Sequence, residues 1–138
     1  MVANVATAIT PSCTMATMPS GTGGTIVEGT YVMTAQTYYG TSGCASTPLA
    51  TTFVYSGGCV QEITTSAGID VRAAVTFDVH DTNEVTKTVA CVSPTISGAT
   101  VDTATITYTA TPTSFTLFTH NSGTGSVNPD RVESFRKL

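Results

Sequence analysis

The chain has no tryptophan, few charged residues and no long apolar run. Charged residues make up 10% of the chain, against about 25% in typical soluble domains. No apolar stretch approaches the roughly 20 residues of a membrane-spanning helix. Lysine and arginine together number five and the net charge is −4, which argues against nucleic acid or an anionic membrane surface as a partner. We therefore expect no nucleic-acid partner and no membrane span.

Several catalytic and metal-binding motifs are also missing. The four cysteines, at positions 13, 44, 59 and 91, include no C-x-x-C pair of a zinc site. The glycine-rich stretch 20–24 lacks the Gly-Lys-Ser/Thr of a phosphate loop. No Gly-x-Ser-x-Gly nucleophile motif is present. These absences predict no cofactor and no metal, and they favour a protein without catalytic activity.

Threonine is what the chain has in abundance, with thirty residues among 138. From 103 to 111 threonine fills every odd position, and the even positions hold Ala104, Ile106, Tyr108 and Ala110. Successive side chains of a strand point to opposite faces, so this period of two predicts one polar and one buried face. Threonine suits a polar strand face because it is β-branched and carries a hydroxyl.

The same alternation predicts eight strands after residue 28, at about 30–39, 49–56, 59–65, 70–79, 84–92, 103–111, 114–119 and 131–137. Short turns such as Ser56-Gly57-Gly58 make neighbouring strands antiparallel. The predicted fold is all-β: an eight-stranded antiparallel up-and-down meander closed into a barrel, with a two-sheet β-sandwich as the alternative. Residues 1–28 are expected to be a flexible Thr/Ser/Gly-rich lead-in, and 29–138 a single barrel domain.

The predicted connections sort into two ends. Those at about 40–48, 66–69, 93–102 and 120–130 share one end, and the links at the other end are shorter. A rim of long loops around an apolar interior is where a ligand would enter. Tolerated insertions explain long loops equally well, so both interpretations stay open here.

The predicted inner faces carry apolar and tyrosine side chains. On strand 30–39 this face holds Tyr31, Met33, Ala35 and Tyr39. A bound ligand would contact Tyr31, Met33, Phe53, Tyr55, Val75, Phe77, Ile106, Tyr108 and Leu117. The tyrosine hydroxyls would orient it. No aspartate, glutamate or histidine is expected to face inward in the clear strands. Small inward alanines leave open whether the interior has a cavity or is filled.

The even number of cysteines and the scarcity of lysine favour an oxidising compartment with two disulfides. Cys44 and Cys59 flank one predicted strand, about 23 Å apart, too far for a bond. We predict the pairs Cys44–Cys91 at the long-loop end and Cys13–Cys59, which would pin the lead-in over the opposite end. Met1–Ile9 lacks the basic start and apolar length of a secretory signal.

Two further groups are candidates for chemistry. Oxygen ligands gather around one hairpin, at Asp78, His80, Asp81, Asn83 and Glu84. They could hold calcium, although the spacing is not that of an EF-hand and a solvated turn is the favoured interpretation. His120 lies on the expected rim, where it could contact a ligand or simply be exposed.

Residues about 28–137 resemble a small lipocalin-like β-barrel of a secreted or surface-attached bacterial protein. The resemblance rests on the segments 28–34, 53–58 and 131–135. Lipocalins open with Gly-x-Trp and pack a basic residue of the last strand on that tryptophan. Here Gly29-Thr30-Tyr31 would be the counterpart, with tyrosine in place of tryptophan, and Arg131 or Arg136 would be the basic partner. An avidin-like barrel is disfavoured because biotin sites are lined by tryptophan.

The resemblance implies an extracellular, periplasmic or cell-surface binding protein for a small apolar or aromatic molecule, without catalysis. The first alternative is a solid-core interaction or structural module that contacts carbohydrate or another surface protein. A further alternative is a barrel cyclase or isomerase that encloses its substrate. The ligand and the oligomeric state do not follow from the sequence.

Overall fold

The computed structural model describes residues 2–44, 46–88, 105–120 and 129–138. They form nine strands: β1 (Ser12–Thr14), β2 (Gly29–Tyr39), β3 (Leu49–Ser56), β4 (Cys59–Ser66), β5 (Ile69–His80), β6 (Glu84–Thr88), β7 (Thr105–Thr111), β8 (Ser114–His120) and β9 (Asp130–Lys137). All eight predicted strands are present. The predicted portions at 89–92 and 103–104 lie outside the described residues. The described residues contain no helix able to cross a membrane.

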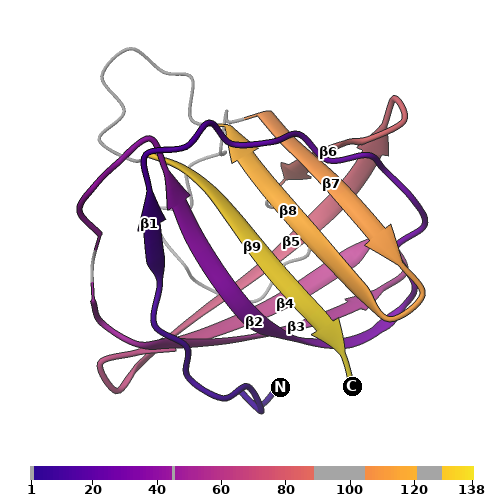
Figure 1. The fold of residues 1–138 in the computed structure, drawn as a ribbon. Coiled ribbons are helices and arrows are strands. Elements are labelled where there is room, and N and C mark those ends of the chain that lie inside the picture. Colours follow the sequence, from indigo (N-terminus) through magenta and orange to yellow (C-terminus); the bar gives the residue numbers. More distant parts are fainter. Residues whose placement is uncertain (1, 45, 89–104, 121–128) are drawn as a thin grey trace.

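Strands β2 to β9 form a closed antiparallel barrel (Figure 1). Each strand pairs with the next, and β9 returns to pair with β2 from Asp130 to Lys137. Closure satisfies the backbone groups that a sheet edge would leave unpaired. The predicted lipocalin-like barrel is thereby confirmed, and the sandwich alternative does not occur.

The two ends of the barrel differ in their connections. Links 57–58, 81–83 and 112–113 make up the short-loop end. Links 40–48, 67–68, 89–104 and 121–129 belong to the long-loop end. Much of the latter set, namely 45, 89–104 and 121–128, lies outside the described residues.

A bulge in β2 changes which residues face the interior. Met33 pairs with Phe135, but the next partners are Ala35 with Ser134 and Gln36 with Glu133. The extra residue shifts the alternation by one. Tyr31 and Met33 are buried before the bulge, Ala35 is exposed and Gln36 is buried after it. The placement of Ala35 and Tyr39 on the inner face is therefore wrong.

The lead-in wraps the barrel as a strap (Figure 1). β1 pairs in parallel with the end of β2. Ile9 forms an antiparallel bridge with Leu49, and Gly23 a parallel bridge with Thr109. Gly23 has a φ of +87°, and a side chain there would collide with the backbone of Thr82, so only glycine fits this approach. That the lead-in is flexible and separate from the barrel domain stays a prediction.

Outward-facing threonines hold this strap. The hydroxyl of Thr52 accepts hydrogen bonds from the amides of Val5 (3.0 Å) and Ala6 (3.2 Å), and donates to Asn4 Oδ1 (2.8 Å). The hydroxyl of Thr107 accepts one from the amide of Gly21 at 2.8 Å. Both threonines are buried. The outer face of the barrel is therefore not uniformly exposed to solvent, because part of it binds the chain's own lead-in.

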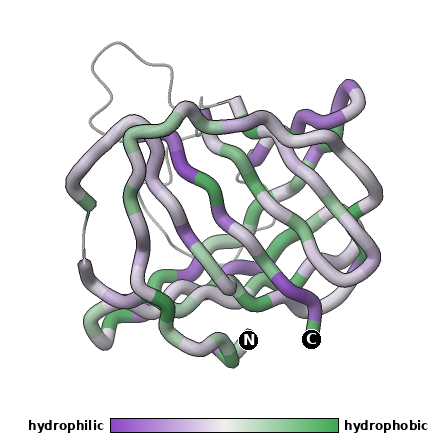
Figure 2. Tube along the Cα trace, in the orientation of Figure 1, coloured by the Kyte–Doolittle hydropathy of each residue, from purple (hydrophilic) through white to green (hydrophobic). Residues whose placement is uncertain are grey.

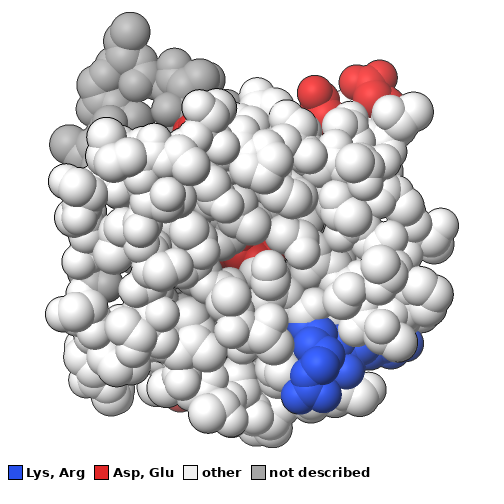
Figure 3. Space-filling model, in the orientation of Figure 1, with Lys and Arg blue, Asp and Glu red and all other residues white. Residues whose placement is uncertain are grey.

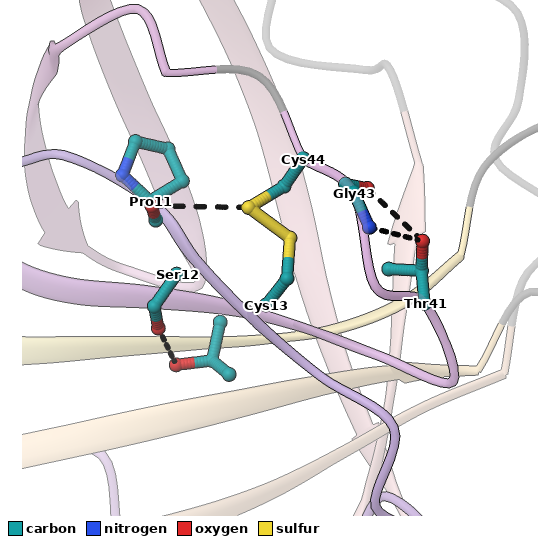
Figure 4. Close-up of a disulfide and its surroundings, with 7 residues drawn as sticks. Pro11, Ser12, Cys13, Thr41, Gly43 and Cys44 are labelled. Atoms are coloured by element: carbon teal, nitrogen blue, oxygen red, sulfur yellow. Dashed lines mark hydrogen bonds between the residues drawn. A yellow bond between two sulfur atoms is a disulfide. The ribbon is translucent and has the colours of Figure 1, made fainter.

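The disulfide prediction is wrong in its pairing. Cys13 is bonded to Cys44, with Cα atoms 5.9 Å apart (Figure 4), so neither Cys44–Cys91 nor Cys13–Cys59 forms. The prediction assumes that the lead-in reaches the short-loop end at this point. Instead, β1 places Cys13 opposite Tyr38, near the end of β2. Cys59 is also disulfide-bonded, and Cys91 lies outside the described residues.

The core occupies the short-loop half of the barrel. Figure 2 shows hydrophobic and hydrophilic residues interspersed along the strands, with both kinds on β9. Phe53 lies 4.5 Å from Phe135, and Phe135 lies 4.7 Å from Phe115, measured between ring centres. Tyr31 meets Phe115 edge-on at 4.8 Å. Such aromatic contacts contribute beyond the burial of their area, and they fill this half of the interior.

The lead-in and Lys137 close the short-loop end. The Tyr31 hydroxyl donates to the carbonyl of Val27, and the Tyr108 hydroxyl donates to that of Gly24 at 2.8 Å. The Lys137 side chain covers Gly29, where its Cε lies 2.5 Å from the place of a Cβ.

The expected basic partner of the Gly29-Thr30-Tyr31 opening is thus Lys137, which pairs in register with Tyr31. Arg131 lies at the opposite end of β9, and Arg136 is exposed. The prediction of Arg131 or Arg136 as that partner is wrong.

Replacing Thr52 with valine should destabilise the protein by about 1–3 kcal/mol, because the partly buried hydrogen bonds to Asn4, Val5 and Ala6 lose their shared partner. Chemical denaturation measures this change. Thr116→Val is the matched control, since Thr116 lies on β8 and its hydroxyl bonds no described lead-in residue. Equal stability of the two variants would contradict the strap interpretation.

Candidate binding site in the barrel interior

The structure brings the nine predicted ligand contacts together in one cluster. Eight of them are buried and Tyr55 packs against the cluster while partly buried. Their inward placement follows the predicted alternation. They contact one another and the neighbouring rings, so they form a floor to the interior. Their role in ligand binding stays a prediction.

Inward-facing side chains of β5 are buried in the middle of the strand and exposed toward both of its ends. The exposed fraction is 48% at Val79, 5% at Phe77, 9% at Val75, 59% at Val71 and 66% at Ile69. Ala73, between them, is intermediate. These residues alternate on one face of the strand, the face that carries the core. The inner face of β5 is therefore exposed beyond Ala73 toward the long-loop end, and again at Val79 near the short-loop end.

A layer of polar side chains lies above the apolar floor. It consists of Gln36, Glu62, Lys87, Arg131 and Glu133, and is called the polar layer below. Glu62 pairs across the sheet with Phe53 and Ala73, Glu133 with Leu117, and Lys87 with Phe77. Each therefore shares the inward face of its core partner.

The β2–β9 side of the polar layer is tightly bonded. Gln36 Nε2 donates to Glu133 Oε1 at 2.9 Å, and Arg131 Nε lies 3.3 Å from the same oxygen. The Glu133 side chain is 10% exposed and that of Arg131 31%. Gln36 Oε1 is buried and accepts no hydrogen bond from the described residues. A buried carbonyl without a donor is costly, so this oxygen calls for a donor beyond the described residues.

The β3–β4 side carries a chain of hydroxyls that ends at Glu62. The hydroxyls of Thr51 and Thr64 lie 2.9 Å apart, and Thr64 donates to Glu62 Oε1 at 3.2 Å. Burial raises the pKa of Glu62 above its ordinary value of 4.5, and nearby Glu133 raises it further. Lys87, Thr64 and Arg131 act in the opposite direction without cancelling the effect of burial.

Lys87 faces the interior from β6, where it pairs with Phe77. Its ammonium lies 5.7 Å from the ring centre of Phe53 and 5.5 Å from that of Phe77. Both distances are within the range of a cation–π interaction. The lysine thus connects the apolar floor to the polar layer.

The expectation that no acidic residue faces inward covers the clear strands alone. Glu62 on β4 and Glu133 on β9, two strands whose faces the sequence does not fix, do face inward. Two signals in the sequence could have found them. Phe135 faces the core, so Glu133, two residues earlier in β9, faces the same way. Glu62 falls two residues after the buried Val60 in β4, a short strand with little apolar content. Lys87 already stands out in the sequence, because it interrupts an apolar stripe.

The other charged groups lie on the outside. Figure 3 shows acidic side chains at the β5–β6 hairpin, basic ones near the C terminus, and little charge elsewhere on that face. At the hairpin, His80, Asp81 and Glu84 each offer a ligand atom within 4.8 Å of the others. His80 Nδ1 lies 3.7 Å from both carboxylates. His120 ends β8 and is partly buried.

No family model, no curated protein and no solved structure matches this chain. Its function is therefore inferred from the geometry of the barrel.

The raised pKa of Glu62 predicts that the folded state is less stable at higher pH. The stabilising contribution of its protonated form is complete below about pH 4.5 and is lost as pH rises through the folded-state pKa. Glu62→Gln keeps a neutral side chain at every pH. We expect this variant to match the parent near pH 4 and to exceed its free energy of unfolding near pH 8.

Urea denaturation across this pH range measures the difference. Glu28→Gln removes one negative charge from the exposed lead-in and serves as the control. A difference between Glu62→Gln and the parent that stays constant with pH would contradict the assigned charge state.

Proposed function

We propose that this protein binds a small apolar or aromatic molecule in the long-loop half of its barrel. The observation that carries the proposal is the exposure of Val71, at 59%, on the inner face of β5 beyond buried Val75 and Phe77. In the proposed site, the ligand reaches the apolar floor from this end. Desolvation of an apolar ligand surface on such a floor is worth about 25 cal/mol per Å².

The polar layer would orient the ligand. Gln36 Oε1 lacks a donor among the described residues, and partly exposed Glu62 and Lys87 flank the floor. Few polar groups placed around an apolar surface are typical of small-molecule sites. The hydroxyl protons of Tyr31 and Tyr108 are engaged by lead-in carbonyls, so orientation by these tyrosines is not part of the proposal.

The proposed location is secreted, periplasmic or on the cell surface. The Cys13–Cys44 disulfide supports an oxidising compartment. It also ties the lead-in to the loop after β2, which is part of the long-loop end.

Tryptophan substitution on the two faces of β5 tests the proposal. Ala73 pairs with Glu62 on the inner face, and Ala74 pairs with Gln61 on the outer face. We expect Ala73→Trp to weaken binding of an environment-sensitive apolar dye by at least about tenfold, because the indole occupies the space above the floor. Ala74→Trp should bind as the parent does.

Dye fluorescence gives the dissociation constants, and thermal melts verify that both variants fold. The parent has no tryptophan, so the introduced indole also reports ligand contact directly. Equal affinities in the two variants, or no saturable binding by the parent, would exclude the interior site. The latter result would favour the solid-core interaction module.

Enclosed acid–base chemistry is a second candidate function, and Glu62 is the observation that favours it. A carboxyl with a raised pKa inside an apolar barrel can deliver a proton to a bound substrate. Incubating a bound carbonyl compound in D₂O and following its proton signals by NMR tests this. Exchange by the parent that is lost in Glu62→Gln would support the enzyme, and equal exchange in both would exclude it.

A further inference from the structure

The lead-in fills a gap in the barrel wall between β2 and β3. Among the described residues, the pairing of these two strands stops at Val32 and Thr52. Beyond this point the end of β2 pairs with β1 (Figure 1). Leu49, at the start of β3, exchanges two backbone hydrogen bonds with Ile9, at 2.8 and 2.9 Å. The lead-in therefore lies as an inserted strand between two strands that are direct neighbours at the short-loop end.

Residues 2–14 contact the barrel as a docked peptide would. β1 adds a parallel ladder to β2, the amide of Val5 donates to the Thr52 hydroxyl at 3.0 Å, and the Asn4 side chain donates to the carbonyl of Ala50 at 2.8 Å. Hydrogen bonds of this kind are how a sheet takes up an added strand. Each of them can form with the same strand of another copy.

A short exposed segment connects these residues to the rest of the lead-in. Met15 is 69% exposed, and Ala16 and Thr17 are exposed as well. Met18 is buried again, and Gly23 is held by its bridge to β7. A change of backbone direction at residues 15–17 would therefore carry the docked strand to another barrel without disturbing the rest of the lead-in. Exchange of identical elements through such a hinge is a low-cost route to an assembly.

The Cys13–Cys44 disulfide joins the docked strand to the loop that follows β2 (Figure 4). Cys44 is exposed and Cys13 is partly exposed, so a small thiol can reach the bond. The bond forms between whichever strand occupies the gap and the barrel that holds it. It therefore records covalently which copy supplied the strand.

We propose that residues 2–14 are a donor strand that also fills the β2–β3 gap of a second copy of this chain. The second copy is the partner because the structure shows the identical segment seated in this gap. The smallest closed assembly is a dimer in which each copy fills the gap of the other. Two internal Cys13–Cys44 disulfides become two between copies through attack of a thiolate on a disulfide sulfur, with no net oxidation. This assembly does not depend on the interior binding site.

Two variants test the exchange. Cys44→Ser keeps the donor thiol and Cys13→Ser keeps the acceptor thiol. They are mixed in equal amounts with reduced and oxidised glutathione, and each disulfide formed between chains reduces one oxidised glutathione to two thiols. Random encounters give about twice as much mixed dimer as either homodimer, whereas docking before bond formation should raise this ratio about tenfold. A size tag on one chain separates the three dimers on a non-reducing gel, and peptide mapping identifies the bonded cysteines.

Ile9→Pro in the donor chain tests whether the strand must dock. It removes the amide that donates to the Leu49 carbonyl, so the ratio should fall to about the random value. Ala8→Pro is the matched control, since Ala8 is exposed and its amide bonds no described residue. This variant should keep the excess of mixed dimer. Thermal melts verify that each chain folds.

A random ratio in the mixture, or an excess that Ile9→Pro leaves unchanged, would overturn the proposal. The parent chain gives a second measurement that needs no variant. Isotope-labelled and unlabelled parent are mixed in the same glutathione buffer, and a peptide pair with Cys13 from one and Cys44 from the other shows a bond between copies. We expect such mixed pairs to increase with protein concentration, and their absence would also overturn the proposal.

Discussion

The pairing of β9 with β2 is the constraint on which the rest of this structure depends. It turns a sheet with two faces into a barrel with an inside and an outside. The bulge after Met33 then shifts the alternation within that same pairing. Without the shift, Ala35 would face the interior and Gln36 would lie outside. The extra residue in β2 thus places the Gln36 side-chain amide beside Glu133, where it forms part of the polar layer.

The barrel interior contains a large share of the few charged side chains of this protein. The chain has five lysines and arginines and nine aspartates and glutamates, and two of each sign face the interior. Buried charges are costly unless they are paired or shed their charge. Arg131 and Glu133 use the first solution, and the raised pKa of buried Glu62 favours the second. Lys87 lies over the rings of Phe53 and Phe77 and interacts electrostatically with Glu62.

Much of the fold follows from the sequence because alternation and turns are local signals. The period of two locates the strands and the floor, and Ser56-Gly57-Gly58 marks a tight link. The polar layer follows less readily. Its residues are found only once the strand parity is known, and a bulge such as the one in β2 has no clear local signature. Glu62 also lies in a strand whose apolar content is low.

The course of the lead-in is the part that local patterns miss. Its glycines and threonines are typical of a linker, yet Gly21 and Gly23 allow its backbone to approach β7, and Thr52 on β3 provides a binding point for Val5. These are contacts between segments far apart in the sequence. The Cys13–Cys44 pairing follows from the same long-range course, since it depends on β1 running parallel to β2.

The two ends of the barrel therefore differ in how completely their polar groups are hydrogen-bonded. At the short-loop end the lead-in accepts the hydroxyl protons of Tyr31 and Tyr108, and aromatic rings fill the space above them. Polar groups at that end already have their partners. At the long-loop end, the Gln36 carbonyl oxygen has no donor among the described residues. An unsatisfied acceptor held over an apolar floor is a reason to place recognition at this end.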